Sequence, residues 1–161
     1  MTTLYTRWTS PLGELVLVCD ERALFALELP GRHRRRDGRT FATSPFAAAL
    51  EQLGEYFAGE RTAFDLRLAA RGTPFDRAVW DQLGEIPYGE TRSYGQIARA
   101  LGRPHRARAV GASNARNPLP IIVPCHRVVG SDGSLTGYGG GVEAKRALLA
   151  LERGVWQERL I

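Results

Sequence analysis

The stretch SYGQIARALGRPHRARAVGASN, residues 93–114, decides the fold of the second half of the chain. Ser93 has the side chain of a helix N-cap, and apolar residues follow it at helical spacing. Gly102 then supplies a turn with a left-handed backbone, and a second helix is predicted from about 105 to 114. This order is typical of a helix-turn-helix, but an αα-hairpin that packs internally and binds nothing has the same pattern.

The charge around this stretch favours a polyanion as partner. Positions 91–131 contain seven arginines and no carboxylate, in a chain of net charge +5. A region of one sign attracts nucleic acid, although a solvated basic face would look the same.

The residues before position 72 predict a small α/β module. Apolar, β-prone runs at 14–19 and 24–29 indicate a hairpin, and Gly31–Arg39, with five arginines, reads as an exposed loop. Ser44 is expected to cap a helix with proline in its first turn, and the alternation at 64–68 predicts a half-buried strand.

A domain boundary is predicted near residue 72, between an N-terminal module (1–72) and a mainly helical C-terminal domain (73–161). Thr73-Pro74 begins a helix after the joint, and Glu143–Arg153 forms the last one. No run of 18 apolar residues and no leader pattern is present, and only two cysteines occur. We therefore expect a cytoplasmic protein without a membrane partner.

Pro124-Cys125-His126 is the most informative tripeptide. The composition of Ile121–Val123 is that of a buried strand, and Pro124 stops regular structure directly before the thiol. A neighbouring base or cation is the usual means of making a thiolate, although a buried cysteine is more often inert. Contact between Cys125 and His126 needs a turn or a bridging water, because neighbours on an extended chain point opposite ways. The spacing does not suit a metal site or a papain-type hydrolase.

Two downstream features add to this segment. The glycines of Thr136–Gly141 would let the backbone approach a flat ligand closely, or would form a plain loop. Glu152 lies in the last turn of a helix, where the helix dipole disfavours an acid, so a specific partner is expected. The ring of His126 is the obvious candidate.

Five motifs together resemble the O6-alkylguanine-DNA alkyltransferases. They are Pro124–Gly130, Ile86–Tyr94, Arg108–Gly111, Asn117-Pro118 and Gly137–Gly140. The resemblance implies a ribonuclease H-like N-terminal module and a winged-helix-like helix-turn-helix domain. It also implies direct-reversal repair of O6-alkylguanine, and of O4-alkylthymine, in duplex DNA whose damaged base is rotated out.

The resemblance implies a catalytic role for five residues. Cys125 would accept the alkyl group irreversibly, once per molecule. His126 would deprotonate Cys125 through a water, and Glu152 would orient His126. Asn117 would tie the second helix to the cysteine segment, and Tyr94 would help to rotate the base or donate a proton to it.

The same resemblance assigns residues to DNA and to the base pocket. Arg108 would fill the gap that the extruded base leaves. The other expected DNA contacts are Tyr94, Arg92, Ala107, Ala109, Gly111 and Ser113. The expected pocket residues are Tyr138, Gly139, Val128 and Pro120, with the carbonyls of Cys125 and Val128 selecting the exocyclic amine of guanine.

The expected partner is double-stranded DNA containing O6-alkylguanine, bound by a monomer that can cluster on DNA. No cofactor and no metal are expected, because Cys19 alone cannot replace the zinc ligands of some relatives. Some relatives also carry serine at the position of Gly139. The alternatives are a DNA-lesion binder without chemistry and a cysteine-dependent redox protein or hydrolase.

Overall fold

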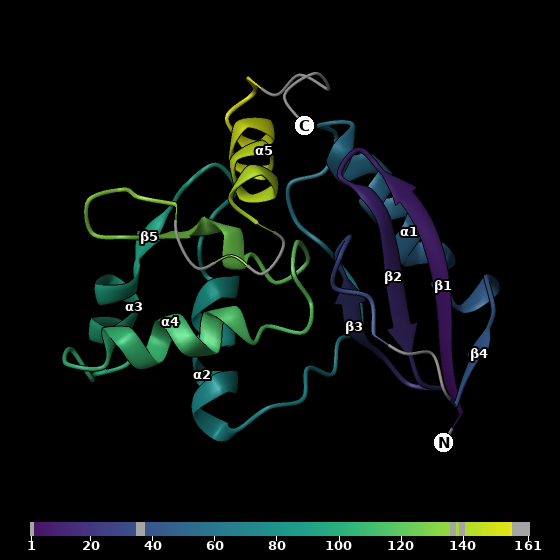
Figure 1. Ribbon diagram of the computed structural model, residues 1–161, viewed down its shortest axis with the longest axis horizontal. Helices are drawn as coiled ribbons and strands as arrows, with labels where there is room; N and C mark the ends of the chain where they lie inside the picture. The colour runs from purple at the N-terminus through teal and green to yellow at the C-terminus, as the bar shows by residue number, and fades with distance from the viewer. Residues whose placement is uncertain (1, 35–37, 136–137, 139–140, 156–161) are drawn as a thin grey trace.

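The computed structural model describes residues 2–34, 38–135, 138 and 141–155. It has two lobes, an N-terminal one built around a sheet and a C-terminal one built from helices (Figure 1). One hydrophobic cluster runs through both, from Leu15 and Leu53 to Val79, Ile97 and Leu148. The predicted fold class is confirmed.

The sheet of the N-terminal lobe has the strand order β3-β2-β1-β4. Its strands are β1 (Thr3–Ser10), β2 (Gly13–Cys19), β3 (Leu24–Glu28) and β4 (Arg39–Phe41). The predicted hairpin is β2–β3, paired antiparallel. The first strand, β1, pairs antiparallel with β2, and β4 joins its other edge in parallel. The expected loop therefore ends before Arg39, and its residues 35–37 lie outside the described part of the chain.

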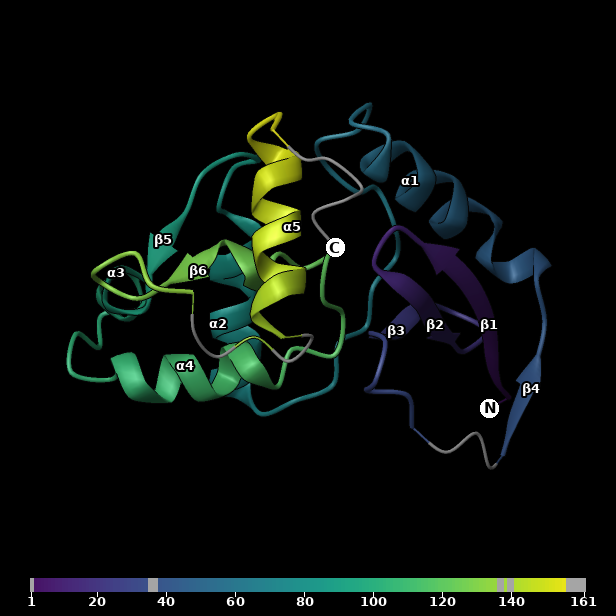
Figure 2. The same ribbon diagram turned by 45° about the horizontal axis from the view of Figure 1, so that its top comes forward.

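One face of this sheet is covered by α1 (Ala47–Phe57) (Figures 1 and 2). A 3-10 helix, η1 (Ser44–Phe46), precedes it, and its N-cap is Thr43 without a side-chain hydrogen bond. The prediction of Ser44 as the cap is wrong, because the proline constrains the turn one residue earlier than expected.

Residues 64–68 do not form the predicted strand. Leu68 makes one isolated parallel bridge with Leu24, and Leu68 is exposed. The segment continues as the connection to the C-terminal lobe, so it borders the sheet at one point only.

The C-terminal lobe begins with α2 (Pro74–Gly84), which Thr73 and Asp76 start with a reciprocal capping box. The helix-turn-helix follows as α3 (Tyr94–Ala100) and α4 (Ala107–Ala115). Ser93 caps α3 together with Gln96, as its side chain predicts. Gly102 has φ of 72°, which allows the turn between the helices.

The segment between α4 and the last helix carries the cysteine. Ile121–Val123 is a turn instead of the predicted strand, and Ile121 has φ of 74°. A 3-10 helix, η2 (Cys125–Arg127), leads into β6 (Val128–Val129), which pairs in parallel with β5 (Arg92–Ser93). The final helix, α5 (Val142–Glu152), stands between the helix-turn-helix and the sheet lobe (Figure 2).

Candidate active site

Cys125 begins η2 at the inner end of a cleft between the two lobes. Its side chain is 5% exposed. The backbone amide of Cys125 donates to the carbonyl of Val123 at 2.8 Å, and the amide of Arg127 donates to Pro124 at 3.0 Å. The cysteine and His126 therefore lie on a 3-10 turn and not on an extended chain, which meets the backbone condition that the sequence set for their acting together.

His126 and Glu152 form a buried pair. The ring Nε2 of His126 lies 2.6 Å from Oε2 of Glu152, and neither side chain is exposed to solvent. Burial lowers the pKa of His126, and the carboxylate only partly opposes this. The ring is therefore neutral at pH 7, and a proton on Nε2 leaves Nδ1 as an acceptor.

Glu152 is the centre of a larger network. Arg127 donates Nε to Oε1 at 2.7 Å and Nη2 to Oε2 at 3.0 Å, while the hydroxyl of Tyr56 in α1 donates to Oε2 at 2.7 Å. Burial opposes ionisation, but the hydrogen bonds from His126 and Arg127 outweigh it and hold the pKa of Glu152 well below its ordinary value. Glu152 is thus a fixed negative charge behind the imidazole, and the predicted partnership with His126 is present.

The thiol of Cys125 is protonated at rest. Burial raises its pKa to about 11, against a hydrogen bond from Asn117 and the positive charge of Lys145. A group that removes the proton during the reaction is therefore needed.

Lys145 was not found by sequence reasoning. Its side chain is fully buried on α5, and Nζ donates to the carbonyl of Val128. The helical spacing of Lys145 with Leu148, Leu149 and Glu152 puts it on the inner face, and it is the only lysine in the sequence. Its place on the apolar face of the helix, together with the rarity of lysine, could have pointed to Lys145 from the sequence.

Two asparagines hold the cysteine segment. Asn117 donates Nδ2 to the carbonyl of Val123 at 2.8 Å and accepts from the amide of Leu119 at 3.0 Å. Asn114, which the sequence did not single out, lies on α4 and donates Nδ2 to the carbonyl of Cys125 at 3.3 Å. The helix-turn-helix is therefore linked directly to the residue that bears the thiol.

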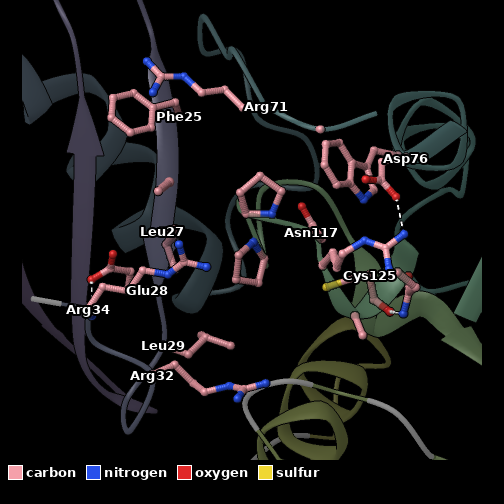
Figure 3. Close-up of a pocket in the computed structure, with 18 of the residues that line it drawn as sticks. Phe25, Leu27, Glu28, Leu29, Arg32, Arg34, Arg71, Asp76, Asn117 and Cys125 are labelled. Carbon is pink, nitrogen blue, oxygen red and sulfur yellow. Dashed lines mark hydrogen bonds and ion pairs between the residues drawn. The ribbon is translucent and has the colours of Figure 1, made fainter. Parts of the chain in front are cut away.

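The cleft has a volume of about 1020 Å³ and runs from β3 to Cys125 (Figure 3). Its C-terminal wall includes Pro120 and Tyr138, as expected, together with Asn114 and Asn117. The opposite wall carries Phe25, Leu27 and Leu29, with arginines at its rim (Figure 3). Its volume is large enough to receive a flat ring with apolar faces.

Three buried polar atoms around this site have no hydrogen-bond partner among the described residues. They are Nδ1 of His126, Oδ1 of Asn114 and the hydroxyl of Tyr138. Buried polar atoms are nearly always paired in native proteins, so an unpaired group of them marks a place where a ligand or solvent binds.

Two expected pocket residues are not seen in the wall. The side chain of Val128 is fully buried outside the cleft lining that the structure describes, and its carbonyl accepts from Lys145. Gly139 lies outside the described residues, as do Thr136, Gly137 and Gly140.

The residues expected on DNA differ in how exposed they are. Arg108 is exposed on α4, while Ala107, Ala109 and Gly111 are half-buried along the same helix. The ring of Tyr94 packs beside Gly111, where an added Cβ would lie 3.7 Å from it. These side chains border the helix-turn-helix and are not in the cleft wall that the structure describes.

Ser113 and part of the basic stretch are used internally. Ser113 is fully buried and donates to Oδ1 of Asp76 at 2.6 Å, so its expected contact with DNA is corrected. Arg116 also pairs with Asp76 at 2.6 Å, and Arg127 is buried against Glu152. Arg92 is half-buried and pairs with Glu90 at 3.3 Å.

Two family models match the two lobes. The 6-O-methylguanine DNA methyltransferase ribonuclease-like domain matches residues 3–70, and the DNA binding domain of the same family matches residues 74–154. The chain belongs to the 6-O-methylguanine DNA methyltransferase family. The family resemblance predicted from the five motifs is therefore confirmed.

Members of this family match along nearly the whole chain. The methylated-DNA–protein-cysteine methyltransferase of Mycolicibacterium paratuberculosis is 52% identical over 151 residues, which cover 92% of each chain. The constitutive one of Bacillus subtilis is 46% identical over 162 residues, covering 96% of this chain and 98% of the relative. The crystal structure of Mycobacterium tuberculosis OGT in complex with DNA has a TM-score of 0.92 at 48% identity, over 98% of both chains.

The described residues form neither a metal site nor a membrane span. Within the described ranges, no three or more histidine, cysteine or acidic side chains gather in a way that could hold a metal ion. Among those same residues, no helix has the length and apolar character needed to cross a bilayer.

Proposed function

We propose that this protein repairs DNA by transferring the alkyl group of O6-alkylguanine from duplex DNA to Sγ of Cys125. The observation that carries the proposal is the buried thiol at the inner end of the cleft, in the residue directly before a neutral imidazole that a fixed carboxylate orients. The named activity of the methylated-DNA–protein-cysteine methyltransferases supports the same substrate.

The reaction is a displacement at the alkyl carbon. The proton of Cys125 passes to Nδ1 of His126 through a bridging water, and the resulting thiolate attacks the carbon. The S–C bond forms as the C–O6 bond breaks, and its electron pair stays on the base. A proton returned to the base completes guanine, so the thiol proton replaces the alkyl group overall. The thioether does not revert, so each molecule acts once.

Glu152 assists by charge and by geometry. It accepts a hydrogen bond from Nε2–H, which fixes the tautomer in which Nδ1 is basic, and its negative charge stabilises the imidazolium that forms. Arg127 and Tyr56 hold the carboxylate in place. Lys145 adds a positive charge near the sulfur, which favours the thiolate.

The target base has to leave the duplex, because chemistry inside a base stack is sterically blocked. Unstacking costs a few kcal/mol. We propose that α4 enters the minor groove, where its small residues Ala107, Ala109 and Gly111 allow close approach. Arg108 then fills the gap in the stack, and Tyr94 assists rotation or protonates the base. O4-alkylthymine presents a similar ether and is a second substrate.

We further propose that the protein acts as a cytoplasmic monomer that can cluster on DNA, with its domain boundary near residue 72. Both cysteines are free thiols, which suits a reducing compartment. Cys19 ends β2 in the other lobe, so no resolving thiol lies beside Cys125 that would favour a redox role.

Intact mass spectrometry tests the proposal. After incubation with an oligonucleotide duplex containing O6-methylguanine, the protein should gain one methyl group in place of one hydrogen, on the peptide that contains Cys125. Cys125→Ser should bind the duplex with unchanged affinity and gain nothing. Methylation of the serine variant, or repeated turnover by the wild type, would overturn the proposal.

A further inference from the structure

Asn114 presents a buried acceptor that nothing in the described protein uses. The side chain is 2% exposed, and its Oδ1 has no hydrogen-bond partner among the described residues. Leaving such a buried acceptor unpaired destabilises the protein, so a ligand that donates to it gains affinity. Turning the amide over would not help, because it would place Oδ1 against the carbonyl oxygen of Cys125.

The position of this oxygen is set by its partner on the same amide. Nδ2 of Asn114 donates to the carbonyl of Cys125 at 3.3 Å, and Oδ1 shares a carbon with Nδ2. Oδ1 therefore lies beside the backbone of the nucleophile. Asn114 also lines the cleft together with Cys125 and Tyr138. A base that presents its ether to Sγ would have to pass its edge close to this amide.

The amide is held rigidly from behind. Ser113, the preceding residue, donates Oγ to Asp76 at 2.6 Å, and its carbonyl accepts from Nε1 of Trp80 at 2.8 Å. Both partners belong to α2, so the end of α4 that carries Asn114 is fixed against a neighbouring helix. An acceptor fixed before binding discriminates well, since little ordering entropy is lost when the ligand arrives.

We propose that Oδ1 of Asn114 accepts a hydrogen bond from the exocyclic amine of the extruded O6-alkylguanine, which makes Asn114 a specificity-determining residue. The inference rests on the proposed function. Alkylation at O6 removes the hydrogen from N1, so the exocyclic amine carries the only N–H donors on the ring. The carbonyls of Cys125 and Val128, expected from the resemblance to bind this amine, already accept from Asn114 and Lys145. Oδ1 is the acceptor that stays unpaired beside Cys125, so it fits guanine and not hypoxanthine, which has the same ether without the amine.

Single-turnover methyl transfer from two duplexes tests this inference. One duplex contains O6-methylguanine and the other O6-methylhypoxanthine at the same position, and both are used with saturating protein. The wild type should react at least tenfold faster with guanine. In Asn114→Leu the ratio of the two rates should fall at least threefold, through slower reaction with guanine.

A structural effect of the substitution would slow both reactions alike and leave the ratio within threefold of the wild type, which would overturn the inference. If a water molecule is the only partner of Oδ1 of Asn114, the ratio of the two rates should also stay unchanged, which would likewise overturn the inference. Asn114→Ala provides the same comparison with the best helix former, should the leucine variant not fold. Gln82→Leu removes an amide from α2 away from the cleft and should change neither rate. A wild type that accepts no methyl from either duplex would contradict the proposed function itself.

Discussion

Replacing Glu152 by glutamine tests how the thiol is activated. The substitution keeps the size of the side chain and removes its charge. If the new amide nitrogen faces His126, it can only donate a hydrogen bond to Nε2. The ring proton then moves to Nδ1, and the base that would deprotonate Cys125 is lost. If it turns the other way, it faces the donors Nε of Arg127 and the amide of Gly89, which bond to Oε1 in the wild type.

The size of the effect follows from the thiol. With the pKa of Cys125 raised to about 11, about one molecule in 10⁴ carries a thiolate at pH 7 without help from a base. We therefore expect Glu152→Gln to transfer methyl about 10³–10⁴ times more slowly, or about 4–5.5 kcal/mol in activation free energy. The deficit should shrink as pH rises toward 11, because the thiol then ionises unaided.

Single-turnover transfer from a methylated duplex, measured from pH 7 to 10, gives this result directly. Tyr56→Phe is the matched control, since it removes one hydrogen bond from the same carboxylate and keeps the charge. It should slow transfer less than about tenfold, in line with about 1 kcal/mol for one hydrogen bond. A folded Glu152→Gln protein within tenfold of the wild-type rate at pH 7 would refute the assigned role of the His126–Glu152 pair.

Three further outcomes are expected. Arg108→Ala should slow repair of duplexes at least tenfold while leaving reaction with free O6-benzylguanine within about twofold, and equal losses would argue against a part in base extrusion. Asp76→Asn should lower the free energy of unfolding by about 1.5–3 kcal/mol at pH 7, measured by urea denaturation. Because Arg116 holds the pKa of Asp76 below its ordinary 3.8, this stabilisation is complete above that pH and is lost as pH falls below it, so an unchanged difference at pH 2 would contradict the pairing. DNA affinity should fall with salt at a log–log slope of about −3 or steeper if the exposed Arg99, Arg103 and Arg108 each neutralise a phosphate, and a flat response would exclude that face.

Features encoded by neighbouring residues were predictable from the sequence. Thr73 and Ser93 start helices where expected, because a capping side chain acts within three residues of its own position. The prediction of a strand at Ile121–Val123 was wrong, because an apolar run indicates burial but not backbone conformation. The first strand, β1, carries too little apolar alternation to be recognised, and its pairing with β2 places it.

The site was predictable to the same extent. Cys125 and His126 are adjacent, and Glu152 is conspicuous at the end of its helix, so local chemistry pointed to all three. Tyr56 and Asn114 carry no such sign. Tyr56 reaches Glu152 across 96 positions of sequence, and Asn114 looks like any polar residue on a helix until the cysteine segment is folded against it.

The hydrogen bond from the Tyr56 hydroxyl joins the two lobes, so separating the lobes would break it. The hydroxyl comes from α1, and it bonds the carboxylate that governs the imidazole in the other lobe. A fragment truncated at residue 72 would lose that donor and open a hydrophobic core to water at the same place. A shortened protein made of the C-terminal lobe alone would therefore need a substitute for α1, because that lobe contains Cys125 but lacks the hydroxyl that bonds Glu152.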